Sequence, residues 1–275
     1  MATRRSGRHA VVTLSAPGIA DQVRAGQYAA VAVGGQNPST LLRRAMWIAE
    51  SAPTGRQGGV IEVVADAEET GGAWLAEQPR GAPVDVIAPL GRPFSAPVEP
   101  AACLLIGIET SAAALLRLGA LLTSRGSHVD YLLLGEPTRV YGALEARRLG
   151  SSLRSEAIPT GVNHRRARIA DVVSAALSDA DIDVVYSAGP APDVAAVADV
   201  VAAKGLPHQT ALSRVTACGS GVCAACAVPV VGTDGITRVV RACTEGPVFD
   251  ADRVLWQDLA PPPGVWKSPE RDPHD

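Results

Sequence analysis

The 275-residue sequence lacks the features that mark several common protein classes. It has no run of about 18 apolar residues, which a membrane span needs, and no N-terminal apolar segment of signal-peptide length. It has no basic excess, since 25 Lys and Arg face 28 Asp and Glu, and we expect no nucleic-acid partner. Walker A, G-x-S-x-G and H-E-x-x-H motifs are also missing, which leaves kinase and hydrolase functions without support. We therefore expect a globular, cytoplasmic protein with no membrane span.

Cysteine is scarce, and its distribution is uneven. The chain has five cysteines, and four of them are bunched toward the C-terminus as Cys218, Cys223, Cys226 and Cys243. This clustering indicates metal binding in a reducing compartment and not a secreted disulfide framework. The fifth, Cys103, lies in the apolar run AACLLIG, where we expect an unreactive buried thiol.

The four clustered cysteines have the spacing C-x4-C-x2-C-x16-C. A [2Fe–2S] cluster needs two thiolates for each iron, and a loop with x4 and x2 spacing can supply three of them. Gly219 and Gly221 favour such a loop, because they adopt positive φ and let backbone N–H groups approach the sulfides. Zinc is the alternative, although only Cys223 and Cys226 form the short knuckle typical of zinc sites. The spacing thus predicts a [2Fe–2S] site.

The chain divides by pattern into three parts. Short β-like runs separated by turns in residues 1–99 predict a small antiparallel barrel or sandwich. Strands alternating with helices in residues 100–210 predict a doubly wound parallel sheet. Residues 211–275 hold the cysteines, a Pro-rich segment and a charged tail that should fray. The expected strands are 9–16, 27–35, 58–67, 84–91, 103–108, 128–136 and 181–189, and the expected helices are 111–126, 140–150 and 193–205.

Several segments, taken in order over nearly the whole chain, resemble one family. They are APGIADQVRAGQY, LLRR at 41–44, IAPLG at 87–91, AGPAPDV, the loop CGSGVCAAC and RACTEGPVFDADRVLW. The family is the iron–sulfur electron-transfer subunit of NAD-linked dihydroorotate dehydrogenase, a branch of the ferredoxin–NADP reductase superfamily.

The resemblance implies a flavin barrel, then a nicotinamide domain, then a [2Fe–2S] domain with the four clustered cysteines as ligands. It also implies a hetero-oligomer with a catalytic, FMN-containing dihydroorotate dehydrogenase subunit of pyrimidine biosynthesis. In the resembling proteins, electrons pass from that FMN through the cluster to FAD and then to NAD. This chain would then have no dihydroorotate site of its own.

The flavin motif departs from the family pattern of Arg, any residue, an aromatic and Ser. Here only Arg44 is kept, and Trp47 stands at the last position. Gly71 and Gly72 stand where the family has a phosphate-binding Gly-Thr pair, and the carboxylates of segment 66–69, if unpaired, would repel a diphosphate. The resemblance thus assigns any FAD contacts to these four residues. The alternative reading makes Trp47 a core residue.

The nicotinamide motif departs further. Where the family has a glycine-rich turn, this chain keeps Gly107 and places Glu109 at a later glycine position. A carboxylate there would occupy the place of a pyrophosphate at the helix N-terminus, and Thr110 and Ser111 would serve as a helix N-cap. A cysteine that often lies near the nicotinamide is replaced by Ala188. We therefore do not expect NAD to bind.

The remaining polar groups show no metal or catalytic spacing. The basic segment 164–168 is expected to be a solvated loop before a helix, with steering of an acidic partner as the alternative. All five histidines are expected at the surface or in loops and not as ligands or bases. They are His9, His128, His164, His208 and His274.

Three functional hypotheses follow. The first is an electron-transfer subunit that accepts electrons from a flavin dehydrogenase partner and relays them to an acceptor other than NAD. The second is a non-catalytic structural subunit, in which the cluster only stabilises the fold. The third is an intact FAD- and NAD-dependent reductase subunit.

Overall fold

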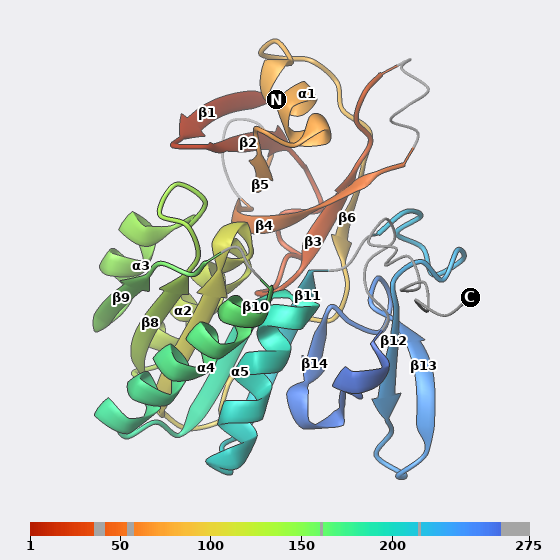
Figure 1. Cartoon of the computed structure of the whole chain (residues 1–275). Helices are drawn as coiled ribbons and strands as arrows, with labels where there is room; N and C mark the ends of the chain where they lie inside the picture. The colour runs from red at the N-terminus through yellow and green to blue at the C-terminus, as the bar shows by residue number, and fades with distance from the viewer. Residues whose placement is uncertain (36–41, 54–57, 160–161, 214–215, 260–275) are drawn as a thin grey trace, which may run out of the picture.

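The computed structural model describes residues 1–35, 42–53, 58–159, 162–213 and 216–259. These residues form two six-stranded sheets and one two-stranded sheet (Figure 1). The C-terminal tail that the sequence predicts to fray lies outside the described residues, as does residue 41 of the LLRR segment. Within these ranges, no helix has both the length and the apolar character needed to cross a bilayer.

The N-terminal sheet is antiparallel throughout, in the order β1-β2-β5-β4-β3-β6. Its strands are rich in Val, Ile and Ala, and alternate side chains on β2 and β5 fill a core that α1 helps to cover. The antiparallel β architecture expected for this part is confirmed. The sequence did not predict β4, because charged residues near both ends of the strand interrupt the apolar pattern of its buried centre. The elements are β1 (Ala2–Ser6), β2 (His9–Ser15), β3 (Tyr28–Val31), β4 (Arg44–Ala52), β5 (Val60–Asp66), α1 (Thr70–Glu77) and β6 (Val86–Leu90).

The second six-stranded sheet, here called the parallel sheet, has the order β14-β11-β10-β7-β8-β9. Only the edge strand β14 runs antiparallel to its neighbour. Helices α4 and α5 lie together on one face and α2 on the other, so the predicted doubly wound arrangement is confirmed (Figure 1). The elements are β7 (Ala102–Ile108), α2 (Ala113–Ser124), β8 (His128–Leu134), α3 (Ala143–Leu149), β9 (Ser152–Glu156), α4 (Val162–Asp179), β10 (Val184–Pro190), α5 (Ala191–Ala203), β11 (His208–Ser213) and β14 (Val248–Asp250).

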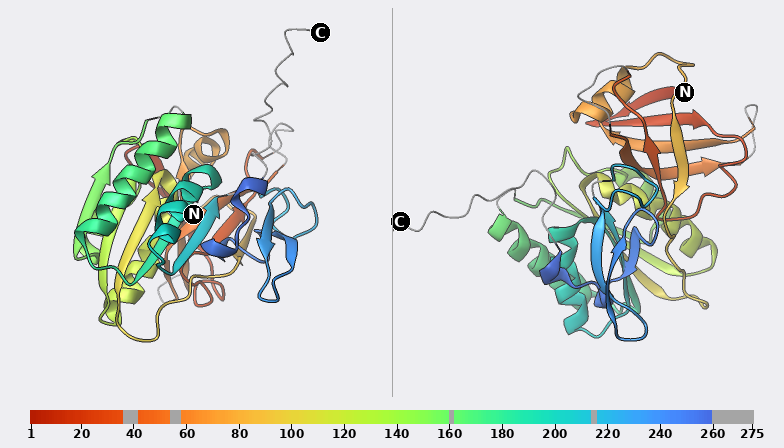
Figure 2. Two further views of the ribbon diagram at one scale, coloured as in Figure 1. Left: turned by 60° about the horizontal axis from the view of Figure 1, so that its bottom comes forward. Right: turned by 90° about the vertical axis from the view of Figure 1, so that its right-hand side faces the viewer.

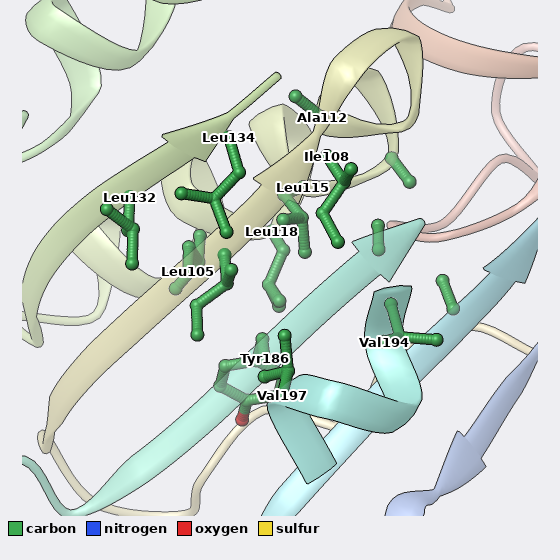
Figure 3. Packing of buried hydrophobic residues seen from close by; sticks show 14 of the residues in the cluster. Leu105, Ile108, Ala112, Leu115, Leu118, Leu132, Leu134, Tyr186, Val194 and Val197 are labelled. Carbon is green, nitrogen blue, oxygen red and sulfur yellow. The ribbon is translucent and has the colours of Figure 1, made fainter. Parts of the chain in front are cut away.

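The main hydrophobic core lies between the parallel sheet and its helices (Figure 3). Leu105 of β7, Leu118 of α2 and Tyr186 of β10 are all at most 1% exposed. Burying a side chain of this size contributes about 1.5–3 kcal/mol before the loss of conformational entropy is counted. The sheet is therefore a firm platform for the loops that leave its strands.

The cysteine-bearing part is a small antiparallel hairpin, β12 (Ala227–Val231) and β13 (Thr237–Arg241). The 3-10 helices η3 (Ala251–Arg253) and η4 (Trp256–Asp258) follow β14, and Val230 forms a bridge to Val254. The hairpin lies below the N-terminal sheet and beside the parallel sheet (Figure 2). Cys226, Val228 and Cys243 belong to the same buried cluster as the parallel sheet, so the hairpin shares its core.

Helix α2 joins the two large sheets. It packs against β4 as well as against β7 and β8. Its Arg117 donates from Nη1 to Glu50 Oε1 at 2.9 Å and from Nη2 to the Val23 carbonyl oxygen at 3.2 Å. These bonds hold the N-terminal sheet against the carboxyl-end side of the parallel sheet, where ligands bind in open α/β folds.

Candidate functional site

The four clustered cysteines lie at one end of the β12–β13 hairpin. Cys218 and Cys223 belong to the cysteine loop, defined here as residues 216–226, which leads into β12. Cys226 closes that loop, and Cys243 follows β13. Cys226 and Cys243 are each 2% exposed, whereas Cys223 is exposed to solvent. The hairpin thus brings a residue distant in sequence to the end of the loop.

Backbone N–H groups and neighbouring thiols act on the sulfur atoms. Hydrogen bonds from the backbone N–H groups of Cys223 and Ser220 lower the pKa of the Cys218 thiol to about 5. The Cys243 N–H donates to Cys226 Sγ at 3.4 Å. Burial, and then the neighbouring Cys226 thiol, raise the pKa of Cys243 to about 11. In the described part of the chain, no three or more His, Cys, Asp or Glu side chains converge closely enough to hold one metal ion.

The cysteine loop has the backbone conformation that its sequence predicts. Gly219 and Gly221 have φ of +71° and +80°, values that side-chain-bearing residues rarely adopt. A Cβ on Gly219 would lie 3.2 Å from Ala30 Cβ and 3.3 Å from Leu90 Cδ1. The loop therefore lies directly on strands β3 and β6 of the N-terminal sheet.

Tyr28 of β3 connects the N-terminal sheet to the cysteines. Its hydroxyl donates to the Cys243 carbonyl oxygen at 3.3 Å, and burial raises its pKa, with the Cys243 thiol adding to the effect. Its ring meets the Trp47 ring edge to face at a centroid distance of 6.3 Å. Two aromatic rings thus lie between the cysteines and the cavity described next.

The four residues expected to contact FAD surround one small cavity. Arg44, Trp47, Gly71 and Gly72 all line a space of about 150 Å³ between the N-terminal and parallel sheets. A neighbouring space of about 480 Å³ shares Arg44 with it. The Arg44 guanidinium is turned back onto its own backbone, donating to the Leu42 carbonyl oxygen at 3.0 Å.

Both Trp47 and the glycine pair have structural roles beside this cavity. Trp47 is 8% exposed and belongs to the main core, as the alternative reading expected. A Cβ on Gly72 would overlap the Asp66 carbonyl oxygen, because helix α1 presses onto the end of β5. A Cβ on Gly71 would lie 2.8 Å from Cγ of the flexible Arg44 side chain and 3.2 Å from Val33 Cγ2, and would meet no backbone atom as closely.

The carboxylates of segment 66–69 are not all unpaired, so the condition for the repulsion of a diphosphate is only partly met. Arg8 Nη2 lies 2.8 Å from Asp66 Oδ2, and Arg8 Nη1 lies 2.6 Å from Glu68 Oε2. Burial alone would raise the pKa of Asp66, but the hydrogen bond from Arg8 outweighs it and the pKa is lowered. The Arg8 guanidinium therefore offsets much of the negative charge beside the cavity.

Glu109 follows β7, at the end of the parallel sheet that faces this cavity. It lies in the 3-10 helix η2 (Glu109–Ala112), and its carboxylate lies 3.2 Å from Arg165 Nη2. Thr110 and Ser111 form no helix cap, contrary to expectation: the Thr110 hydroxyl lies 3.1 Å from His9 Nε2 across the domain boundary. In place of the expected capping bond, Thr110 of η2 contacts His9 of β2 in the N-terminal sheet.

Comparison with known proteins identifies the family. Residues 214–255 match the model of the iron–sulfur cluster binding domain of dihydroorotate dehydrogenase B. The dihydroorotate dehydrogenase B (NAD(+)) electron transfer subunit of Bacillus caldolyticus is 30% identical over 246 residues, which cover 89% of this chain and 91% of that protein. The same subunit of Geobacillus kaustophilus matches with the same identity and coverage. The chain belongs to this family of electron transfer subunits.

The family fold extends to more distant proteins. The structure of an NADH-dependent reduced ferredoxin-NADP oxidoreductase superposes with a TM-score of 0.74, covering 92% of this chain and 87% of that one at 20% sequence identity. This likeness confirms the ferredoxin-reductase-like architecture expected for an electron transfer subunit of this family.

Two further sequence interpretations need correction in this family member. The basic segment 164–168 belongs to helix α4 and is not a loop, and its Arg165 is held in ion pairs. His9 and His208 are 2% and 9% exposed, so neither lies at the surface. His274 lies outside the described residues.

His208 belongs to a buried polar cluster on the parallel sheet. Its Nε2 lies 2.8 Å from Ser187 Oγ, which donates to Thr210 Oγ1 at the same distance. Within the described structure, its Nδ1 has no hydrogen-bond partner. Parallel pairing of β10 with β11 brings these side chains together, so no spacing within the sequence predicts the cluster.

Sequence reasoning missed Tyr28 and Arg165. Tyr28 is 215 positions from the cysteine whose carbonyl it contacts, and Arg165 is 56 from Glu109. Both contacts join residues far apart in sequence, and no local pattern marks either of them.

Proposed function

We propose that this chain is the electron-transfer subunit of a dihydroorotate dehydrogenase and holds a [2Fe–2S] cluster on Cys218, Cys223, Cys226 and Cys243. It accepts electrons from a catalytic, FMN-containing subunit with which it forms a hetero-oligomer, and relays them to an acceptor. Four free thiols suit a reducing compartment, so we place the complex in the cytoplasm. Dihydroorotate binds to the partner subunit, in keeping with the relatives' designation as electron transfer subunits.

The gathering of four free thiols at one end of the β12–β13 hairpin, within the segment that matches an iron–sulfur cluster binding domain, is the observation that carries this proposal. Two irons need two thiolates each, and the four cysteines can supply them. The C-x4-C-x2-C spacing also contains a single short knuckle, whereas structural zinc sites usually have two. When bound, a [2Fe–2S] cluster supplies one-electron transfer at a potential set by hydrogen bonds and exposure.

Hydrogen bonds to sulfur and partial burial make the four thiols suitable for holding a cluster. The Ser220 N–H donates to Cys218 Sγ, and the Cys243 N–H donates to Cys226 Sγ, both at 3.4 Å. Such bonds stabilise negative charge on sulfur. Burial of Cys226 and Cys243 keeps water from one side, while exposed Cys223 and its neighbour Val222, 85% exposed, give a partner close access to the other.

FAD would be held at Arg44, and it would have to extend from the cavity of about 150 Å³ into the neighbouring space of about 480 Å³, because the first alone is too small. Arg44 would supply positive charge to the diphosphate, and Trp47, Gly71 and Gly72 would form the walls. Pairing of Asp66 and Glu68 with Arg8 supports this assignment, because it lowers the repulsion that a diphosphate meets. Extraction and quantification of flavin from the purified chain tests it, and a stoichiometric yield would favour the intact reductase.

The proposal is tested by mixing the purified chain with its catalytic partner under anaerobic conditions and adding dihydroorotate. The visible absorbance of the chain should bleach within the turnover time of the partner. Absorbance that stays unchanged while the partner's own flavin is reduced would instead support the structural hypothesis, in which the cluster only stabilises the fold.

Two serine variants sharpen this test. Cys223→Ser should abolish the visible absorbance and electron transfer while the partner's flavin is still reduced by dihydroorotate. Cys103→Ser is the matched control, since Cys103 is a buried thiol of β7 whose pKa burial raises to about 11, as its sequence context predicts. Equal loss of absorbance in both variants would mean that the assigned ligand is wrong.

A further inference from the structure

Three residues with ionic contacts lie just beyond the carboxyl ends of neighbouring parallel strands. Glu109 follows β7, and Asp193 lies in the first turn of α5 after β10. Arg139 lies in the segment between β8 and α3. The crevice outside the carboxyl ends of such strands is where doubly wound sheets bind dinucleotides. We call this region the dinucleotide crevice.

We infer that the chain's own carboxylates close the dinucleotide crevice, so that the subunit binds no nicotinamide dinucleotide and its electrons pass to an acceptor of another class. The inference rests on the proposed function for the existence of an electron acceptor. The names of the relatives include NAD(+), and the residues that line this crevice do not suit a nicotinamide dinucleotide.

The backbone at Glu109 has kept a glycine-like conformation. Its φ is +51°, in the left-handed region that disfavours a residue with a side chain. A Cβ on Gly135, at the end of β8, would lie 2.7 Å from Glu109 Cγ, so the missing side chain of Gly135 makes room for the glutamate. The turn therefore has a positive φ that would suit a glycine, but it carries a glutamate whose side chain fits beside Gly135.

The remaining glycine of the motif is used for packing. A Cβ on Gly107 would lie 2.5 Å from Ala112 Cβ and 3.1 Å from Leu133 Cδ2. Gly107 thus allows the start of α2 to pack closely against β7 and β8. It does not open space for a pyrophosphate.

Arg165 of α4 forms ion pairs with both carboxylates of the crevice. Its Nη2 lies 3.2 Å from Glu109 Oε1 and 2.7 Å from Asp193 Oδ2, and its Nε lies 2.8 Å from Asp193 Oδ1. Arg139 Nη1 lies 4.0 Å from the second Glu109 oxygen. The side chains of Arg165 and Asp193 are only 15% and 9% exposed, so this network is largely shielded from water.

The charges in this network already balance. Two guanidinium groups, of Arg165 and Arg139, face two carboxylates, of Glu109 and Asp193. Asp193 lies in the first turn of α5 behind β10, and Glu109 opens the 3-10 helix η2 that leads into α2 behind β7. A pyrophosphate would bring negative charge to a site whose cations and helix ends are already satisfied, and would have to displace Glu109 to reach them.

The test is equilibrium binding of NADH to the purified full chain, followed by calorimetry and by NADH fluorescence. We expect no saturation of the natural sequence at millimolar NADH. Glu109→Gly removes the carboxylate and suits the positive φ, and we expect it to bind NADH at least about tenfold more tightly, a difference of about 1.4 kcal/mol. Added salt should weaken this new binding.

Two more variants complete the design. Glu109→Gln removes the charge but keeps a side chain at a position with positive φ, so it should gain only part of the affinity for NADH that Glu109→Gly gains. Asp179→Asn is the matched control, because it breaks an ion pair with Arg154 of β9, 3.0 Å long, at the last residue of α4 and far along that helix from Arg165. It should bind no better than the natural sequence.

Two outcomes would overturn the inference. Saturable binding of NADH to the natural sequence at micromolar concentration would show an open crevice. No gain in the folded Glu109→Gly variant would mean that Glu109 is not what closes it. Neither outcome bears on the thiol-bound cluster or on its reduction by the partner, so failure here is distinguishable from failure of the proposed function.

Discussion

Replacing Arg165 with methionine removes the cation at the centre of the crevice network and leaves its long apolar stem nearly unchanged. Arg165 donates two hydrogen bonds to Asp193 and one to Glu109. Glu109 keeps Arg139 nearby, at 4.0 Å, but the Asp193 side chain, 9% exposed, keeps no cation among the described contacts. The cost of the substitution is therefore mainly that of a buried carboxylate left without its partner.

The magnitude follows from that burial. Removing one partner of a buried ion pair costs about 3–5 kcal/mol, and the partial exposure of Arg165, 15%, places this case near the lower end. For a chain of this size, about 3 kcal/mol lowers the melting temperature by about 6–12 °C. Denaturation by urea, followed by far-ultraviolet circular dichroism, measures the loss directly.

The neighbouring residue supplies the control. Arg166→Met breaks an ion pair with Asp199 whose two side chains are 56% and 58% exposed, and such a pair is worth at most about 1 kcal/mol. A second substitution, Asp193→Asn in the Arg165→Met background, should recover part of the loss by removing the buried charge. If Arg165→Met costs no more than Arg166→Met, the closed, shielded network described above is refuted.

Two other predictions concern the fold around the candidate sites. Gly72→Ala should lower the free energy of unfolding by about 1–3 kcal/mol, because the added Cβ meets a backbone carbonyl that cannot move away. Gly71→Ala should cost less, because its Cβ lies nearest to the flexible Arg44 side chain. Equal urea midpoints for the two variants would contradict this. Burial lowers the pKa of His208 to about 3 in the folded protein, whereas an unfolded histidine titrates near 6.5. The unfolded chain therefore takes up a proton first as the pH falls below about 6.5, and the folded protein loses stability until the pH nears 3. The loss is about 2 kcal/mol at pH 5. His208→Gln should flatten this part of the pH profile of stability, and an unchanged slope would show that another group titrates.

The regular parts of the fold were predictable because their signals are local. The apolar runs that became β7, β8 and β10 and the helical patterns of α2 and α5 lie within about two residues of the expected bounds at most of their ends. Several elements are missing from the predicted strands and helices, among them β4 and α4, because charged residues interrupt their apolar pattern. Arg44 opens the first, and the second begins at Val162 and runs through the basic segment 164–168.

The candidate site was predictable only where its residues lie close together in sequence. The cysteine spacing and the positive φ of Gly219 and Gly221 are properties of one short loop. The pairing of Arg8 with Asp66 and the contact of Tyr28 with Cys243 depend on register and on domain packing. Such contacts have no signature in a single sequence, so the pairing of charges around the flavin cavity could not be predicted from residue types alone.

The metal content of the purified chain tests the central claim most directly. We would purify the protein anaerobically with iron available, record its visible spectrum, and quantify iron, zinc and acid-labile sulfide per chain. The account predicts about two irons and two sulfides on the four thiolates, with a [2Fe–2S] absorption spectrum. A chain that holds one zinc ion, or neither iron nor sulfide, would contradict it.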